Sequence, residues 1–306
     1  KGRMKAVGNI KRITKTMQLI ATARFQAAQK RATDAKPYTQ KIAELVGELA
    51  SAGGDIKHPL LEAPAKDECK GKELLLVLTA NRGLCGGYNA NILRTAVKFL
   101  NENKDKQIDI EVVGNKGVGF FKFSEIEVAN IHKQFGDKPA FEDVDALANL
   151  YMAQFTGKDY DAVHVCYMSF QSVARQEPKV LNLLPLQPPK SDESEKAGGA
   201  DVKDANATSK GKADSAKMKA VVDYDFSPEP EALLGQLLPS TLKATLFQCF
   251  NDATVGEQVA RMIAMKAATD AAGKQGKALT RQFNRARQTA ITTELTEIIS
   301  GSAALE

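Results

Sequence analysis

The stretch that decides the fold is residues 1–31, KGRMKAVGNIKRITKTMQLIATARFQAAQKR. Apolar side chains recur in it at steps of three and four residues, at Met4, Val7, Ile10, Ile13, Met17 and Ile20. This spacing is typical of an amphipathic helix with a narrow apolar seam. Since Pro37 is the only proline before residue 53, we predict one helix over residues 4–52, roughly 75 Å long at 1.5 Å per residue. A compact domain of this size could not cover such a helix.

The C-terminal part of the chain repeats this pattern. After a helix-start signal at residues 227–230 (SPEP), only Pro239 and a few glycines interrupt the run to Glu306. Apolar residues again repeat at helical spacing, at Leu279, Phe283, Ala286, Ala290, Ile291, Leu295 and Ile298. Two long helices bury narrow seams most simply against one another, so we predict a coiled coil with the middle of the chain inserted between its arms.

The middle of the chain has the alternating pattern of an α/β domain. Apolar runs that read as buried strands occupy residues 73–80, 108–114, 125–131, 161–170 and 179–186. Helical patterns lie between them at residues 89–103, 116–123 and 141–155. This alternation predicts a mostly parallel sheet covered by helices.

A polar segment follows the last strand. Residues 188–217 contain one Val and otherwise only small, charged and turn residues, which cannot offset the entropy of ordering a backbone, so we expect a disordered insertion. No run of about 18 apolar residues occurs in the chain, and no charged-then-apolar leader is recognisable. We therefore expect neither a transmembrane span nor a secretion signal.

The net charge of +5 is unevenly distributed along the 306 residues. Residues 1–31 hold nine basic side chains and no acidic one, and the rest of the chain has 33 basic against 37 acidic side chains. Residues 261–287 add a second basic stretch, with seven Lys and Arg and only Asp270 as an acid. Basic helices of this kind suit either nucleic-acid phosphates or an acidic protein partner. Composition leaves both open, although stacking aromatics are sparse, with Phe25 alone in the first arm.

Signatures of catalysis are weak. The four Cys and three His form no Cys-x-x-Cys or i,i+4 pair, so we expect no metal site and no redox dithiol. The turn at residues 79–89 (TANRGLCGGYN) lies where a dinucleotide-binding turn would, but its Gly-x-x-Gly-Gly spacing departs from Gly-x-Gly-x-x-Gly. An oxidoreductase that uses this turn is a further alternative. The other interpretation is a tight turn in which the glycines supply positive φ. Since no phosphate-binding loop is present either, we expect no catalytic residues and no cofactor.

Three blocks of the sequence resemble the gamma subunit of F-type ATP synthase. They are residues 9–24 (NIKRITKTMQLIATAR), residues 81–89 (NRGLCGGYN), and residues 261–268 (RMIAMKAA) with 286–305 (ARQTAITTELTEIISGSAAL). The resemblance covers both helical arms and the sheet domain, and the polar segment 188–217 is unusually long for it. It implies a long antiparallel coiled coil of the N- and C-terminal helices with an inserted Rossmann-like parallel-sheet domain. It also implies a non-catalytic central-stalk rotor that couples proton flow to ATP synthesis or hydrolysis.

The resemblance also implies partners and contact residues. The partners are the hexamer of alpha and beta subunits, the epsilon subunit and the c-ring, with no nucleic acid and with membrane contact only through the c-ring. Met17, Arg287, Gln288, Thr292 and Glu294 match positions at the beta-subunit interface, and Tyr224 falls near the c-ring or epsilon. The insertion lacks the cysteine pair of chloroplast members, so thiol gating is not expected.

The expected parts are an N-terminal coiled-coil helix at residues 1–55, a Rossmann-like domain at residues 56–226 that includes the insertion, and a C-terminal coiled-coil helix at residues 227–306. A peripheral position on the cytoplasmic face of a bacterial plasma membrane is expected, with the matrix face of the mitochondrial inner membrane as the alternative.

Overall fold

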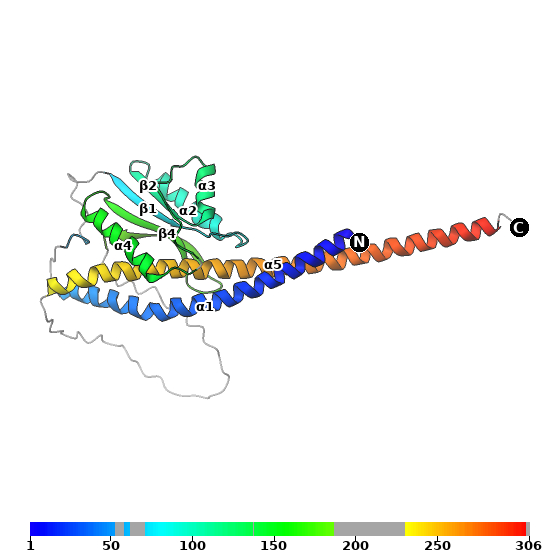
Figure 1. Ribbon diagram of the computed structural model, residues 1–306, viewed down its shortest axis with the longest axis horizontal. Helices are drawn as coiled ribbons and strands as arrows, with labels where there is room; N and C mark the ends of the chain where they lie inside the picture. The colour runs from blue at the N-terminus through cyan, green and yellow to red at the C-terminus, as the bar shows by residue number, and fades with distance from the viewer. Residues whose placement is uncertain (53–57, 62–70, 137, 187–229, 304–306) are drawn as a thin grey trace, which may run out of the picture.

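A pair of long helices and a small sheet domain make up the molecule (Figure 1). The computed structural model describes residues 1–306 except 53–57, 62–70, 137, 187–229 and 304–306. Helix α1 (Gly2–Ala52) and helix α5 (Pro230–Ala303) run side by side in opposite directions, and the sheet domain packs on the first part of α5. The two predicted terminal helices are confirmed, and α1 continues through Pro37. The polar segment 188–217 and Tyr224 lie outside the described residues.

The sheet has five strands in the order β3-β2-β1-β4-β5. Strands β1 (Lys72–Leu78), β2 (Gln107–Val113), β3 (Asn130–His132) and β4 (Ala162–Phe170) are parallel, and β5 (Gln176–Leu184) is antiparallel to β4. β1 lies at the centre, where Leu75 is in register with Ile110 on one side and His164 on the other. A central parallel strand is buried on both faces, which explains its unbroken apolar run.

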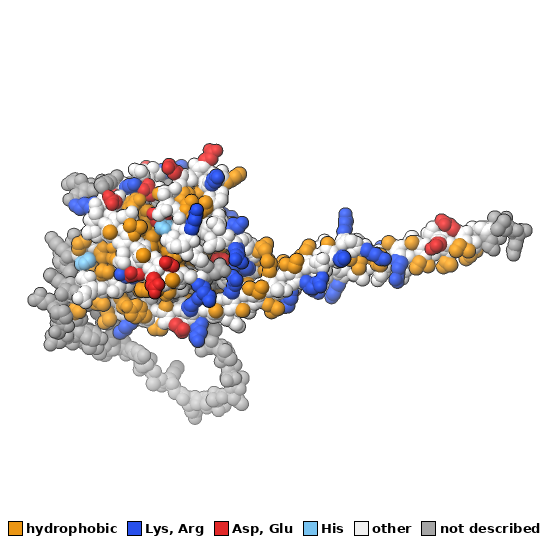
Figure 2. Space-filling model, in the orientation of Figure 1, with side chains coloured by type: hydrophobic (Ala, Val, Ile, Leu, Met, Phe, Trp, Pro, Cys, Tyr) orange, Lys and Arg blue, Asp and Glu red, His pale blue; other side chains and the backbone are white. Residues whose placement is uncertain are grey.

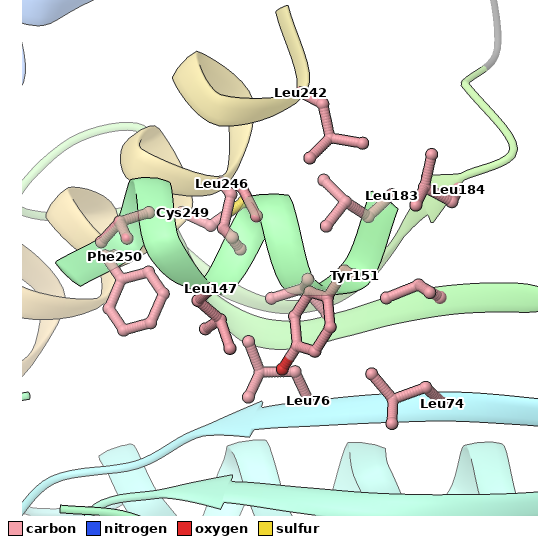
Figure 3. Close-up of a cluster of buried hydrophobic side chains, with 14 of the residues drawn as sticks. Leu74, Leu76, Leu147, Tyr151, Leu183, Leu184, Leu242, Leu246, Cys249 and Phe250 are labelled. Atoms are coloured by element: carbon pink, nitrogen blue, oxygen red, sulfur yellow. The ribbon is translucent and has the colours of Figure 1, made fainter. Parts of the chain in front are cut away.

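Two layers of helices cover the sheet. Helices α2 (Tyr88–Glu102) and α3 (Asn115–Phe123) cover one face, against Leu75 and Val77 of β1. Helix α4 (Phe141–Thr156) and the first part of α5 cover the other face, against Leu74 and Leu76. Figure 3 shows this second core, in which leucines from α4, α5, β1 and β5 meet around the ring of Tyr151. The C-terminal helix is therefore a structural part of the sheet domain.

The third strand is shorter than the predicted span 125–131. Glu125 has a left-handed backbone with φ 54°, and pairing with β2 begins only at Asn130. Ile126 and Val128 pack against the core from an irregular segment. The prediction was wrong here because alternating apolar residues report which side chains are buried and not whether the backbone joins a ladder.

One cluster of polar groups is buried between β2, β3 and α4. The Glu111 carboxylate lies 2.7 Å from Nε2 of His132 and accepts a hydrogen bond of 2.5 Å from the Tyr151 hydroxyl. Burial alone would raise the pKa of Glu111, but these hydrogen bonds outweigh burial and hold its pKa below the ordinary value. The ionised carboxylate therefore ties the short edge strand to the centre of the sheet.

Candidate functional site: the helix pair and its joint with the sheet domain

Between residues 14 and 32 of α1, the seam of the helix pair combines small and polar side chains with one large side chain, Phe25. On α1 the buried residues that follow a seven-residue repeat toward α5 are Thr14, Ala21, Phe25, Ala28 and Ala32. An alternation of three- and four-residue steps averages 3.5, the period of a coiled coil. Small side chains let the two helix backbones come close. We call the helices α1 and α5, paired along this seam, the shaft.

The apolar seam predicted on α1 is wrong beyond its first two members. Met4 and Val7 are half-buried in the shaft, but Ile10, Ile13 and Ile20 are at least half exposed. From Met4 to Ile13 the apolar residues follow at steps of three, which moves them progressively around the helix and away from α5, and Ile20, seven residues after Ile13, lies on the same outer face. The large apolar side chains of this part of α1 therefore lie on its outer face, and the buried positions beside them are taken by Thr14 and Ala21.

A polar contact crosses the seam in the middle of the shaft. The hydroxyls of Thr14 and Thr269 lie 2.8 Å apart, and Thr269 also donates to the carbonyl of Met265 at 2.8 Å. Both threonines are buried. A buried polar pair in a coiled coil favours one register, because a slip of the helices would separate the two hydroxyls and leave each only a carbonyl of its own helix, that of Lys11 for Thr14 and that of Met265 for Thr269.

The apolar repeat at the end of α5 has no described partner helix. The start of α1 reaches Phe283, where the Lys1 ammonium lies 5.8 Å from the ring centre. Farther along, Ile291, Leu295 and Ile298 are about half exposed or more. The prediction that this repeat pairs with α1 is therefore wrong for the last turns, which extend beyond α1 as one helix (Figure 1).

The residues expected at a protein interface lie on the exposed surface of the shaft. Arg287, Gln288, Thr292 and Glu294 are exposed, and the Thr292 hydroxyl donates to the Gln288 carbonyl at 2.9 Å. Met17 is partly exposed on α1, near the level of the Thr14–Thr269 contact. From Thr269 to Arg287 the helix rises about 27 Å, so Met17 belongs to a separate part of the surface.

The sheet domain is joined to the shaft through the turn at residues 81–89. The Arg261 guanidinium donates to the carbonyls of Arg82 and Gly83 at 3.3 and 3.4 Å, and it pairs with Glu257 at 2.6 Å. The buried hydroxyl of Tyr88 donates to the carbonyl of Ala253 at 2.9 Å. We call this contact between residues 81–89 and residues 253–264 the joint. From the sequence, Arg261 was placed in a basic stretch and in the block 261–268, but its ion pair was not predicted, although Glu257 precedes it by four residues, the spacing of a helical ion pair.

The turn at residues 81–89 contains two residues with a left-handed backbone. Gly86 has φ +56°, and a Cβ there would meet the side chain of Ala264 at 3.7 Å. Leu84, which is 59% exposed, also has a left-handed φ of 62°. Sequence analysis expected glycines to supply positive φ in this turn, and Gly86 confirms it. Leu84 was not expected, because a Leu in that conformation is strained.

The crevice that holds a dinucleotide in doubly wound sheets is closed in this chain. At the carboxyl ends of β1 and β2 the described residues leave a hollow of only about 30 Å³, beside Phe135 and Phe250. The start of α3 is occupied by the chain itself, because Gly117 donates to the Thr79 hydroxyl at 2.9 Å. Gly114 lies so close to Thr79 that a Cβ would be 2.2 Å from its carbonyl oxygen. The space is about that of one water molecule. A second hollow, of about 280 Å³, lies against Gly86 and Gly87, but the described residues that line it include no acidic side chain for a ribose hydroxyl, so the geometry gives the oxidoreductase alternative no support.

The thiols of the described residues are buried and unreactive. Burial raises the pKa of both Cys166 and Cys249 to about 12 and raises that of Cys85 as well. Within the described ranges, no cluster of three His, Cys, Asp or Glu side chains could hold a metal ion. In the same part of the chain, no helix carries a stretch long and apolar enough to span a bilayer.

Positive charge collects on the shaft. Figure 2 shows Lys and Arg side chains gathered where the sheet domain meets the shaft and along the shaft beyond it. Between α1 and α5 a groove of about 650 Å³ opens at Gly273 and Gly276, with Lys11, Lys277 and Arg281 at its border. Apolar and basic side chains therefore alternate on the same outward surface, which suits contact with other proteins.

A long, exposed helix pair fixed at one end to a small sheet domain defines a stalk protein. Comparison with known proteins specifies which stalk. The chain belongs to the family of ATP synthase gamma chains: a family model described as ATP synthase matches residues 1–305.

Two relatives illustrate this membership. The ATP synthase gamma chain of Rhodopirellula baltica is 44% identical over 308 residues, which cover 99% of this chain and 97% of the relative. That of Desulforudis audaxviator is 38% identical, over 99% of this chain and 97% of the relative. These relatives give a nucleic-acid-binding function no support.

The fold is also found in a solved structure. The central stalk and c-ring structure of Tetrahymena thermophila mitochondrial ATP synthase contains a chain that matches 84% of this one and 99% of its own length. The TM-score is 0.53 at 18% sequence identity. This match confirms the predicted architecture of terminal helices with an inserted, mostly parallel sheet.

Proposed function

We propose that this gamma chain is the central-stalk rotor that couples proton flow to ATP synthesis or hydrolysis by turning inside a hexamer of alpha and beta subunits. The observation that carries the proposal is the outward face of the shaft. Ile10, Ile13 and Ile20 on α1 and Ile291 and Leu295 on α5 are exposed in the free chain. Exposed apolar side chains along a rod require partners that cover them.

The stiffness that a rotor needs comes from the pairing of the helices. Close packing of Ala21, Ala28 and Ala32 against α5 makes the two helices bend and twist as one body. A two-helix rod also presents a different surface in each direction. Three chemically identical beta subunits around it would each meet a different set of side chains.

The proposed role in the complex is non-catalytic, with nucleotide chemistry on the beta subunits and no cofactor on this chain. The closed crevice beside Phe135 and Phe250 supports this division of labour. Buried thiols with raised pKa values support it too, since they offer no nucleophile at neutral pH.

The proposed contact residues for beta are Met17, Arg287, Gln288, Thr292 and Glu294. Their exposure in the free chain supports the proposal, because each side chain is open to a partner. A guanidinium such as that of Arg287 can share its five donors among several carbonyl and carboxylate acceptors on a turning surface. Tyr224, proposed near the c-ring or epsilon, lies outside the described residues.

The proposed parts are a coiled-coil arm at residues 1–55, a sheet domain at 56–226 and a second arm at 227–306. The sheet domain would meet the c-ring and the epsilon subunit and so provide the only membrane contact. The relatives described above come from bacteria, which supports a peripheral position at a bacterial plasma membrane, on its cytoplasmic face.

Reconstitution tests the proposal. The purified chain is mixed with alpha and beta subunits, and complex formation and ATPase turnover are measured with and without it. A stable complex whose turnover depends on the chain is expected. Failure to form a complex, together with unchanged turnover, would show that the chain is not the rotor of that assembly.

A further inference from the structure

We infer that Arg261 is a positioning residue that holds the turn at residues 81–89 on α5 and so sets the direction in which the shaft leaves the sheet domain. The inference rests on the proposed rotor function and adds to it the place where rotation passes between the two parts.

Helix α5 changes its surroundings near Arg261. Residues from Leu234 to Ala253 pack in the core between the sheet and α4. Helix α1 packs on α5 already at Val255 and Val259, beside Phe25, and from Thr269 onward it is the described partner of α5. Arg261 lies between these two stretches, where the helix leaves the sheet domain.

The Arg261 side chain is held in place from both sides. Only 13% of it is exposed. On its own helix it pairs with Glu257 at 2.6 Å and donates from Nη1 to the Gln258 amide oxygen at 3.2 Å. Its remaining donors reach the carbonyls of Arg82 and Gly83 at 3.3 to 3.4 Å. Because the fork of a guanidinium is planar and rigid, it can bridge a helix to two successive carbonyls in a way that a Lys ammonium cannot.

The other contacts of the joint would remain without Arg261. Tyr88 still bonds to Ala253, and Met168 of β4 still packs on Gly256, where a Cβ would lie 3.2 Å from its side chain. Loss of Arg261 therefore frees the end of the joint without removing the core beneath it. The expected effect is a change in shaft direction and not unfolding.

A small angle at the joint becomes a large displacement along the shaft. From Arg261 to Arg287 the helix rises about 39 Å, so a tilt of about 5° moves Arg287 by about 3 Å. That displacement is as long as a hydrogen bond. A loosened joint would therefore make the positions of the distant interface residues less precise, although none of them touches Arg261 in the structure.

The test measures shaft direction in the isolated full chain. Spin labels are placed at Phe123→Cys, on the exposed end of α3, and at Thr289→Cys on the exposed part of α5, in a chain with Cys69→Ser. The other three cysteines are buried. Distance distributions are compared for the unaltered joint, Arg261→Ala, Arg261→Lys, and a control, Arg281→Ala, which removes an exposed guanidinium of the same helix.

We expect the distance distribution to widen by about 3 Å in Arg261→Ala and in Arg261→Lys, the displacement that a tilt of about 5° produces at this distance along the helix. It should keep its width in Arg281→Ala. Helicity and tyrosine fluorescence should stay unchanged, which shows that the variants fold. Equal widths in Arg261→Ala and the unaltered joint would overturn the inference, as would equal widening in the control. If the distance distribution of Arg261→Lys were as narrow as that of the unaltered joint, the proposal that the guanidinium must bridge the two carbonyls would be overturned.

A second readout uses the membrane complex with its c-ring. Arg261→Ala should lower the rate of proton pumping more than the rate of ATP hydrolysis, so that fewer protons are pumped per ATP hydrolysed. Arg281→Ala should leave this ratio unchanged. An unchanged ratio in Arg261→Ala would overturn the inference while the rotor function stands. If the unaltered chain does not assemble at all, the proposed function fails, and the spin-label distances still decide the inference.

Discussion

Replacing one buried and one exposed apolar residue of α1 by alanine tests which face of the helix packs in the shaft. Phe25 is 9% exposed, and its ring meets Phe170 edge-on at a centroid distance of 6.3 Å beside Val255 and Val259. Truncation of a buried Phe costs about 3–5 kcal/mol, from lost burial and from the cavity that remains. Ile13 is 57% exposed, so the apolar area that it loses is smaller. Alanine also favours a helix more than isoleucine does, so the net cost of Ile13→Ala should stay below about 1 kcal/mol.

Urea unfolding of the isolated full chain, followed by far-ultraviolet circular dichroism, measures the difference. Phe25→Ala should lower the midpoint of the helical transition strongly, and Ile13→Ala should leave it nearly unchanged. If Ile13→Ala were as destabilising as Phe25→Ala, the apolar seam predicted from the sequence would be the packed one. Equal stability of Phe25→Ala and the unaltered chain would refute the seam described here.

Other features allow equally direct tests. Gly114→Ala should destabilise the sheet domain by at least about 3 kcal/mol, since its Cβ would overlap a backbone carbonyl. Gly119→Ala, at a position of α3 with open space around it, should be neutral or stabilising by up to about 1 kcal/mol. Tyrosine fluorescence during urea unfolding separates the two outcomes. Arg287→Ala should slow ATP turnover of the reconstituted complex and leave the helicity of the isolated chain unchanged. Turnover equal to that of the unaltered complex would show that this side chain has no role in the interface. The lowered pKa of Glu111 means that its ionised form stabilises the fold above the ordinary pKa of 4.5 and that this contribution is lost as the pH falls further; Glu111→Gln should therefore flatten the stability profile below about pH 4.5, and a slope equal to that of the unaltered chain would contradict the cause assigned here.

The elements of the fold follow closely from sequence patterns. Four of the five strands and all the helices begin and end near their predicted positions, because buried parallel strands are apolar throughout and helices carry a 3.6-residue repeat. The third strand was predicted too long, since Ile126 and Val128 are buried without pairing. Which residues pair across a sheet depends on neighbours far away in the chain.

The surface of the shaft was harder to predict. The seam was assigned to large residues such as Ile13. Most of the buried positions, such as Thr14, Ala21 and Ala28, carry small or polar side chains, which a search for apolar periodicity does not detect. Hydrophobic periodicity assumes that the largest side chains are covered by the same chain. That assumption fails in a protein whose exposed face is proposed to be covered by other subunits.

The joint illustrates a second limit of sequence reasoning. The glycines of residues 81–89 indicated a tight turn, but nothing local showed that the turn rests on Arg261, far later in the chain. Residue spacing reports neighbours along a helix or strand. Contacts between residues that lie far apart in the sequence can be identified only from the three-dimensional structure.

The pairing of the first and last helices also determines when the molecule can fold during its synthesis. Thr14 and Thr269 are separated by 255 positions, and at about 5–20 residues per second a ribosome takes roughly 13–50 s to make the chain between them. Through that interval α1 has emerged without the helix that covers its seam. The core around Tyr151 also waits for Leu242 and Leu246 of the same late helix. A nascent chain therefore keeps apolar surface open until its final quarter appears, so a chaperone that holds α1 would act before translation ends.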